Sequence, residues 1–172
     1  MKIHLATFYS SDLKRSAERF KKQAESMNVY DYIYIFNQDD LNEDFRNYIS
    51  ELLKKGKKRG YAYWVWQTYV HQVILSKMKE GDVYHWCDVG CHFNIRGLKR
   101  LKEYINIVSK EANGFLGFSY KSLEPKEKYK KYEFKNYLEY EYTKADLIKY
   151  FNLSHDDEII KTPQVWGGSF FV

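Results

Sequence analysis

Apolar and polar positions near the start of the chain predict a strand, a helix and a second strand. Residues 2–10 contain a short apolar run, which stops at the polar triplet Ser10-Ser11-Asp12. Residues 30–36 are dense in Tyr and Ile and are bounded by Asn and Asp, a pattern typical of a strand. Between these runs, apolar side chains recur at spacings of four and three residues, the period of one buried helix face. They are Leu13, Ala17, Phe20, Ala24 and Met27.

The middle of the chain continues the alternation of helices and strands. Residues 41–53 predict a helix that ends in the basic loop 54–60, and residues 63–79 predict an aromatic helix. We expect Val65, Tyr69 and Val73 to face the core from that helix, because they recur every four residues. The apolar run 83–87 predicts a third strand, which ends at Asp88.

The last part of the chain holds one clear helix and several weaker signals. Residues 95–112 carry apolar side chains at helical spacing, and residues 115–118 predict a short strand. Residues 121–142 are charged and rich in Tyr without a period, which is typical of a surface loop or lid. Thr143 offers an N-cap for a short helix through residue 151, and residues 164–172 predict a closing strand.

Strands that alternate with helices of this length predict an α/β protein, with a mainly parallel sheet covered by helices on both faces. The length of 172 residues falls in the usual range for one domain, so we expect a single domain over residues 1–172. Open sheets of this kind bind ligands beyond the carboxyl ends of their strands. Asp88 follows the third strand directly and is expected at such a place.

Charge and composition narrow the class of partner. The formal charge of +5 favours anionic partners such as diphosphates, anionic lipid head groups or nucleic acid. Aromatic residues make up 19% of the chain, which suits faces that stack on sugars or bases, although an AT-rich source explains them equally well. No signal peptide precedes the first strand, and no run approaches the ~20 apolar residues of a membrane span. We expect a cytoplasmic protein, with peripheral membrane association as the alternative.

A carboxylate just past a buried strand is held on a rigid support and faces the crevice in which such sheets bind ligands. Mg²⁺ and Mn²⁺ need only one or two protein carboxylates when the phosphates of a substrate supply the other oxygens. Asp88 therefore suits a metal–diphosphate site. The alternative is that Asp88 only caps a turn with Gly90, and residue chemistry alone favours neither interpretation.

Four side chains form a second group of possible metal ligands: His85, Cys87, Cys91 and His92. Structural zinc sites more often draw a second pair of ligands from a distant segment, whereas these four crowd around one strand end. We therefore expect buried cysteines and a hydrogen-bonded histidine here.

Two stretches resemble a known family. They are RGYAYWVW at residues 59–66 and, after a predicted helix, GDVYHWCDVGC at residues 81–91. Both are similar to bacterial glycosyltransferases of the DXD sugar-binding superfamily, which have the GT-A (Rossmann-like) fold. In that superfamily, a strand end of the form GG-[IV]-Y-x-D-x-D binds the diphosphate of a nucleotide-sugar through a divalent metal.

The chain departs from the family pattern at one of its two carboxylates. If Gly81 and Tyr84 match the Gly and Tyr of the family, Trp86 replaces the first acidic residue and Asp88 matches the second. If Asp88 is taken as the first, Gly90 replaces the second. Because one carboxylate remains in either match, the expected affinity for metal is lower than in the family.

The resemblance implies a function and a set of site residues. The function is metal-assisted transfer of a sugar from a nucleotide-diphosphate donor to a surface glycan or lipid-linked glycan, in polysaccharide biosynthesis at the cytoplasmic face of the membrane. Asp88 is the expected catalytic residue and ligand of Mn²⁺ or Mg²⁺. The expected donor-binding residues are Thr7, Arg59, Trp64, Trp66, Asp88 and Gly90. The expected acceptor residues are Gln164, Trp166, Gly167 and Gly168.

Two other functions stay open. A truncated or degenerate, non-catalytic nucleotide-sugar-binding domain is favoured by the lost carboxylate and by the end at Val172, beyond which GT-A enzymes commonly place acceptor contacts and a metal ligand. A strand that ends there is also expected to leave an open sheet edge, which promotes self-association. A nucleic-acid-binding protein would use residues 121–142, where Lys and Tyr interleave. Five glutamates in that stretch argue against it.

Overall fold

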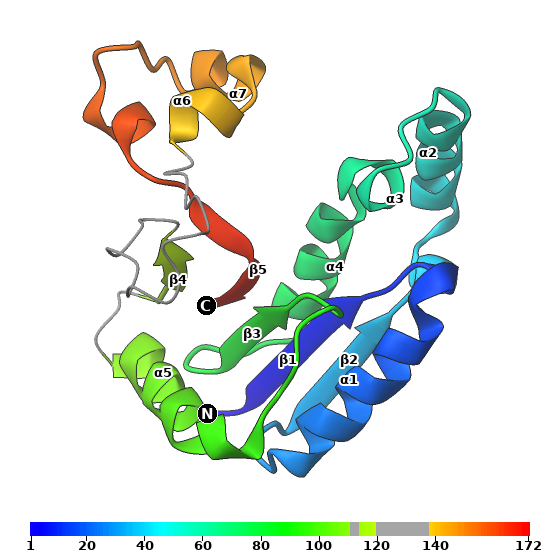
Figure 1. Ribbon diagram of the computed structural model, residues 1–172, viewed down its shortest axis with the longest axis vertical. Helices are drawn as coiled ribbons and strands as arrows, with labels where there is room; N and C mark the ends of the chain where they lie inside the picture. Colours follow the sequence, from blue (N-terminus) through cyan, green and yellow to red (C-terminus); the bar gives the residue numbers. More distant parts are fainter. Residues whose placement is uncertain (111–113, 120–137) are drawn as a thin grey trace, which may run out of the picture. The chain divides into compact units, whose positions relative to one another are not determined.

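The structure is a computed structural model that describes residues 1–110, 114–119 and 138–172 (Figure 1). Twelve labelled helices and strands lie within these ranges, and short 3-10 turns connect some of them. In chain order they are β1 (Ile3–Phe8), α1 (Lys14–Ser26), β2 (Tyr32–Phe36), α2 (Glu43–Lys54), α3 (Gly60–Tyr63), α4 (Trp66–Leu75), β3 (Val83–Cys87), α5 (Leu98–Lys110), β4 (Leu116–Ser119), α6 (Glu139–Tyr142), α7 (Ala145–Tyr150) and β5 (Val165–Phe171).

The described chain divides into two compact units. The first comprises Met1–Leu116 together with Gly168–Val172, and the second comprises Gly117–Gly167. The first unit holds β1, β2, β3 and helices α1 to α5, and the second holds α6 and α7. Most of the predicted loop 121–142 lies outside the described residues, although its last residues form α6.

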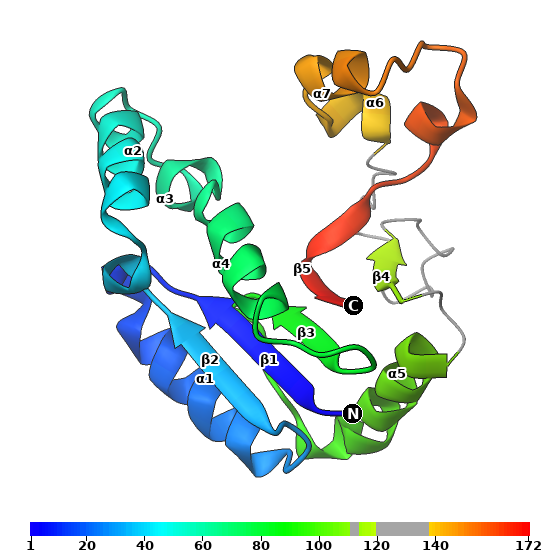
Figure 2. The same cartoon turned by 180° about the vertical axis from the view of Figure 1, so that it is seen from behind.

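The strands form one open, mixed sheet in the order β2-β1-β3-β5-β4. β1 is parallel to both β2 and β3, and the three strands run side by side in both views of the molecule (Figures 1 and 2). β5 is antiparallel to β3, with His85 opposite Phe171 and Cys87 opposite Ser169. The predicted α/β fold with parallel first strands is therefore confirmed, and the closing strand runs in the opposite direction.

Helices cover both faces of the sheet in the first unit, as the sequence predicts. Successive side chains of a strand point to opposite faces, so β1 and β3 each contribute to two cores. The larger core joins the sheet to α2 and α4, and its buried members include Ala6, Phe8, Val70, Tyr84 and Trp86. The smaller core joins the sheet to α1, and its buried members include Leu5, Ala17, Phe20, Ala24 and Cys87.

The predicted aromatic helix is broken, and its buried face differs from the prediction. Residues Gly60–Trp64 have φ angles of 57°, 49°, 67°, 54° and 58°, so they wind left-handed, and α4 begins only at Trp66. A left-handed conformation costs about 1–2 kcal/mol for each non-glycine residue. From α4, the most buried side chains are Trp66, Val70 and Ile74, whereas the expected Val65 and Tyr69 are partly buried and pack against the same core. The reason is that Trp66 fixes the register by stacking its ring on the sheet residue Phe8.

Two predictions for the later part of the chain are wrong. The closing strand β5 lies between β3 and β4, so it does not form the open edge of the sheet. Thr143 does not begin a helix: it ends α6, where its hydroxyl donates to Glu139, and α7 begins at Ala145. The side chain of Thr143 therefore contacts the helix that precedes it and does not cap the helix that follows.

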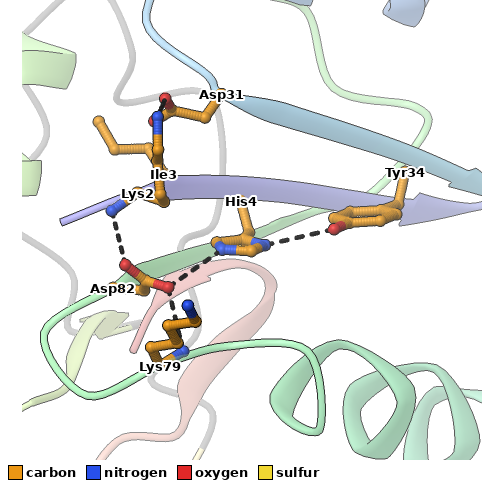
Figure 3. Close-up of polar contacts among 7 residues, drawn as sticks. All are labelled: Lys2, Ile3, His4, Asp31, Tyr34, Lys79 and Asp82. Atoms are coloured by element: carbon orange, nitrogen blue, oxygen red, sulfur yellow. Dashed lines mark hydrogen bonds and ion pairs between the residues drawn. The ribbon is translucent and has the colours of Figure 1, made fainter.

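Polar contacts tie together the amino ends of β1 and β3 (Figure 3). One carboxylate oxygen of Asp82 accepts from the backbone N–H of Lys2 at 2.6 Å, and the other accepts from that of Lys79 at 3.0 Å. The second oxygen also lies 3.5 Å from Nε2 of the buried His4, and Nδ1 of His4 lies 3.4 Å from the hydroxyl of Tyr34. These contacts fix the end of the sheet opposite to the carboxyl ends of the parallel strands.

Candidate functional site

A cavity of about 440 Å³ lies at the carboxyl ends of β1 and β3, entirely within the first unit. Residues from three segments line it: the stretch 8–13 at the end of β1, the stretch 58–66 around α3, and residues 88–90 after β3. Because β1 and β3 are adjacent and parallel, their carboxyl ends meet at the same edge of the sheet. The cavity is thus where open α/β sheets bind ligands.

Asp88 lines the cavity and is half-buried. Its backbone N–H donates to the carbonyl of Gly168 at 2.8 Å, and its Oδ1 accepts from Nε1 of Trp86 at 3.1 Å. Burial raises the pKa of its carboxyl, and the Trp86 hydrogen bond opposes this shift. Within the described ranges no Lys, Arg or His forms an ion pair with Asp88, so its charge is available to a ligand.

Arg19 of α1 holds the loop that follows Asp88. Its guanidinium donates to the carbonyls of Val89 and Cys91, each at 2.7 Å. Gln23, one turn further along α1, accepts from the backbone N–H of Phe93 at 3.2 Å. The loop is therefore fixed to a helix by three hydrogen bonds, which pre-organises the cavity wall.

Aromatic rings form one wall of the cavity. Phe8 stacks on Trp66, with ring centroids 4.0 Å apart, and more loosely on Tyr61 at 6.1 Å. Nε1 of Trp66 donates to the carbonyl of Gly60 at 3.0 Å, and only 5% of Trp66 is exposed, whereas 39% of Trp64 is exposed. Of the two tryptophans expected to bind a donor, Trp66 belongs mainly to the core, and Trp64 offers a free ring surface.

The cation in the cavity wall is Lys58 rather than the predicted Arg59. The guanidinium carbon of Arg59 lies 5.5 Å from the ring centroid of Trp64, which is a cation–π contact. Arg59 therefore supports Trp64 and does not itself line the cavity.

A second carboxylate, Asp12, lines the same cavity as Asp88. It lies in the 3-10 turn Ser11–Leu13 after β1, and Oγ of Ser10 donates to its Oδ1 at 2.5 Å. Asp12 is not among the site residues expected from the sequence. The signal was the polar triplet at the end of the first strand, because the parallel pairing of β1 with β3 brings the residues that follow both strands to the same cavity.

The remaining predicted residues take different places. Thr7 is fully buried and does not line the cavity, and Gly90 does. Gly168 pairs through its carbonyl with the backbone of Asp88. Gln164, Trp166 and Gly167 belong to the second unit. The amide of Gln164 donates to Glu139 at 3.1 Å and to Thr143 at 3.2 Å. Trp166 is 37% exposed.

His85 is a buried, hydrogen-bonded histidine, as expected. Its Nε2 lies 3.0 Å from Oγ of Ser169, its Nδ1 lies 2.8 Å from the hydroxyl of Tyr30, and burial lowers its pKa to about 3. Cys87 is buried and Cys91 is half-buried. Among the residues that the structure describes, no group of three or more His, Cys, Asp or Glu side chains could hold a metal ion. A cation at Asp88 would thus need oxygens from a ligand.

Comparisons with family models, curated proteins and solved structures found no match to this chain. None of the helices in the described ranges is long and apolar enough to cross a membrane. The fold and site define an α/β protein with an open sheet and an acidic, aromatic-walled cavity at the carboxyl ends of two parallel strands.

Proposed function

We propose that this protein is a glycosyltransferase that binds a nucleotide-diphosphate sugar in the cavity at the carboxyl ends of β1 and β3. The observation that carries the proposal is that two carboxylates, Asp12 and Asp88, line one cavity together with the cation of Lys58 and the ring of Trp64. A nucleotide-sugar offers a matching set of groups: a base and a sugar ring to stack, and a diphosphate whose charge is bound directly or through a metal.

Asp88 and Asp12 are the residues that would hold a divalent cation. The Trp86 N–H occupies one oxygen of Asp88, which leaves the other oxygen for a metal or for a hydroxyl of the donor. Asp12 supplies the second carboxylate that the sequence pattern lacks. A bound Mg²⁺ or Mn²⁺ would neutralise charge on the departing nucleoside diphosphate. Lys58 would contribute to the same neutralisation from the opposite segment of the cavity wall.

The acceptor half of the proposal concerns the second unit. We propose that a surface or lipid-linked glycan is the acceptor, with the enzyme at the cytoplasmic face of the membrane. Trp166 has an exposed ring, and rings of this kind stack on carbohydrate. Both N–H groups of the Gln164 amide are held by Glu139 and Thr143, so its carbonyl oxygen would accept from a hydroxyl at a fixed position.

Thermal shifts test donor binding. A panel of nucleoside diphosphates and their sugars, with and without Mn²⁺, should contain at least one ligand that raises the melting temperature of the parent protein. Asp88→Asn should abolish the Mn²⁺-dependent part of the shift while the protein stays folded, because the change is isosteric and removes only charge. Asp12→Asn should reduce the Mn²⁺-dependent part of the shift.

Asp156→Asn, at an exposed position of the second unit, is the matched control and should leave the shift unchanged. If Asp88→Asn shifts as the parent does, Asp88 is only a turn residue. Turnover of the stabilising donor, with release of nucleoside diphosphate, separates a transferase from a non-catalytic nucleotide-sugar-binding domain.

A further inference from the structure

The left-handed turn Gly60–Trp64 forms part of the cavity wall. Five consecutive residues have positive φ, and only the first is a glycine. Strained backbone of this kind persists where the surrounding structure over-determines it, and it clusters at functional sites. Three residues of the turn, Gly60, Tyr61 and Trp64, line the cavity.

Contacts on several sides hold the turn in this conformation. The backbone N–H of Tyr63 donates to the carbonyl of Arg59 at 2.7 Å, and that of Trp64 donates to the carbonyl of Gly60 at 3.0 Å. The carbonyl of Gly60 also accepts from Nε1 of Trp66, and Ala62 is fully buried. The left-handed winding is thus built into the fold.

The handedness decides which rings reach the cavity. Val65 is right-handed, so a right-handed turn would simply continue α4 toward its amino end. At about 100° per residue, Trp64 and Tyr61 would then lie roughly 160° and 140° around the helix from Trp66. They would face away from the side that Trp66 buries. The left-handed winding is what allows all three rings to line a single cavity.

We infer that the left-handed turn Gly60–Trp64 positions the aromatic wall for the ring of the ligand, and that its handedness sets the affinity for a nucleoside diphosphate. The inference rests on the proposed function, because it names the element that shapes the donor cavity. Gly60 is the positioning residue in this scheme: it contributes no side chain to the cavity, and it determines how Trp64 is presented.

Gly60 is the residue that the turn most requires. A Cβ there would lie 2.3 Å from Cδ2 and Cε2 of the Trp64 ring, at a φ of 57° that also disfavours a side chain. Gly60→Ala should therefore displace Trp64 and weaken binding of the stabilising nucleoside diphosphate at least ten-fold. Gly81→Ala is the matched control, because Gly81 has a φ of 83° and open space around it, outside the cavity. The Gly81→Ala variant carries a similar backbone penalty, and it should bind the nucleoside diphosphate as the parent does.

Tyr63 tests the handedness itself. Its side chain is half exposed, its φ is 54°, and it does not line the cavity. Glycine is favoured over alanine in a left-handed turn and disfavoured in a right-handed helix. Tyr63→Gly should therefore melt at a higher temperature than Tyr63→Ala, and both should bind the nucleoside diphosphate as the parent does. The reverse order of melting temperatures would show a right-handed turn and overturn the inference.

Proton NMR gives a signature that does not depend on binding. The Gly60 Hα that occupies the Cβ direction lies over the Trp64 indole, so its resonance should be shifted upfield, and Trp64→Leu should abolish the shift. Binding by Gly60→Ala that equals binding by Gly81→Ala would overturn the positioning role. If uridine, guanosine, cytidine and adenosine diphosphates all fail to bind the parent with Mn²⁺, the proposed function fails, and with it the inference that the turn sets the affinity. The melting temperatures of the Tyr63 variants and the upfield Gly60 proton would still show whether the turn is left-handed.

Discussion

Trp64 and Trp66 are two positions apart and should respond differently to truncation. Trp64→Ala should weaken donor binding by about 1–3 kcal/mol, the range for loss of a stacking ring, with little change in the free energy of unfolding. Trp66→Ala should lower the free energy of unfolding by about 3–5 kcal/mol, because it opens a cavity beside Phe8 in the core. Urea unfolding and nucleotide titration measure the two effects separately.

Trp64→Phe is the control for that comparison, since it keeps a ring and should retain most of the donor affinity. A Trp66→Ala variant as stable as the parent would show that this ring is not part of the core.

Two histidines, the buried His85 and the half-buried His71, predict how stability depends on pH. Burial lowers the pKa of His71 to about 4 and that of His85 to about 3, from an ordinary value near 6.5. In the unfolded chain both rings protonate near pH 6.5, whereas in the folded protein they stay neutral to much lower pH. Their contribution to the free energy of unfolding is therefore fully present above about pH 7 and falls as the pH drops from 6.5 toward 3.

Urea unfolding at pH 7.5, 6 and 4.5 should show this decline. His71→Gln should make it shallower, because one of the two shifted groups is removed and glutamine keeps a partner for the Tyr84 hydroxyl, which lies 2.8 Å from His71 Nδ1. Equal slopes for parent and variant would exclude His71 as a source of the pH dependence.

The pairing of α1 with the loop after β3 makes a helix part of the candidate site. Arg19→Ala removes hydrogen bonds to the Val89 and Cys91 carbonyls and should lower the free energy of unfolding by about 1.5–3 kcal/mol. It should also weaken nucleotide binding, because the segment that carries Asp88 loses its support. Arg15→Ala, one turn earlier on the same helix and exposed, should change neither quantity. Equal effects of the two variants would contradict the role given to Arg19.

Periodicity predicted α1, α5 and the first three strands well, because within each of these elements apolar residues recur at the spacing of the buried face. Among the apolar residues at helical spacing in 95–112, Leu101, Ile105 and Val108 are buried on α5. The break between α3 and α4 was not predictable in this way. Four of its five left-handed residues are not glycine, so local preference opposes the conformation, and contacts such as those with Phe8 and Trp66 favour it.

The sequence predicted site residues that directly follow a strand, but it did not predict residues that a segment distant in sequence contributes to the site. Asp88 follows β3 directly, and the residue types after a buried strand end indicate a ligand site. Arg19 reaches the loop after β3 across 70 or more positions of sequence, and its own helix pattern shows only an ordinary charged residue. The position of β5 between β3 and β4 is equally non-local, which is why the sequence led us to expect an open edge.

At the level of the molecule, the second unit interrupts the first. The chain leaves the first unit at Leu116 and returns at Gly168, and the strands on either side, β4 and β5, are neighbours in the sheet. Residues 120–163 should therefore be replaceable by a flexible linker of about ten residues, which at ~3.4 Å per residue spans the distance between adjacent strands in either direction. The shortened protein should fold and keep its Mn²⁺-dependent nucleotide shift. Loss of the fold would show that the first unit depends on the second.

This arrangement makes the protein modular, since every residue that lines the donor cavity lies outside 117–167. If the protein is the proposed glycosyltransferase, changes within the interrupting segment should alter the KM for the glycan and leave the KM for the nucleotide-sugar unchanged. Exchange of that segment between related chains would then redirect the enzyme to a new acceptor with its donor chemistry intact. Under the proposed function, evolution could change the acceptor glycan through this segment while the binding site for the nucleotide-sugar stays the same.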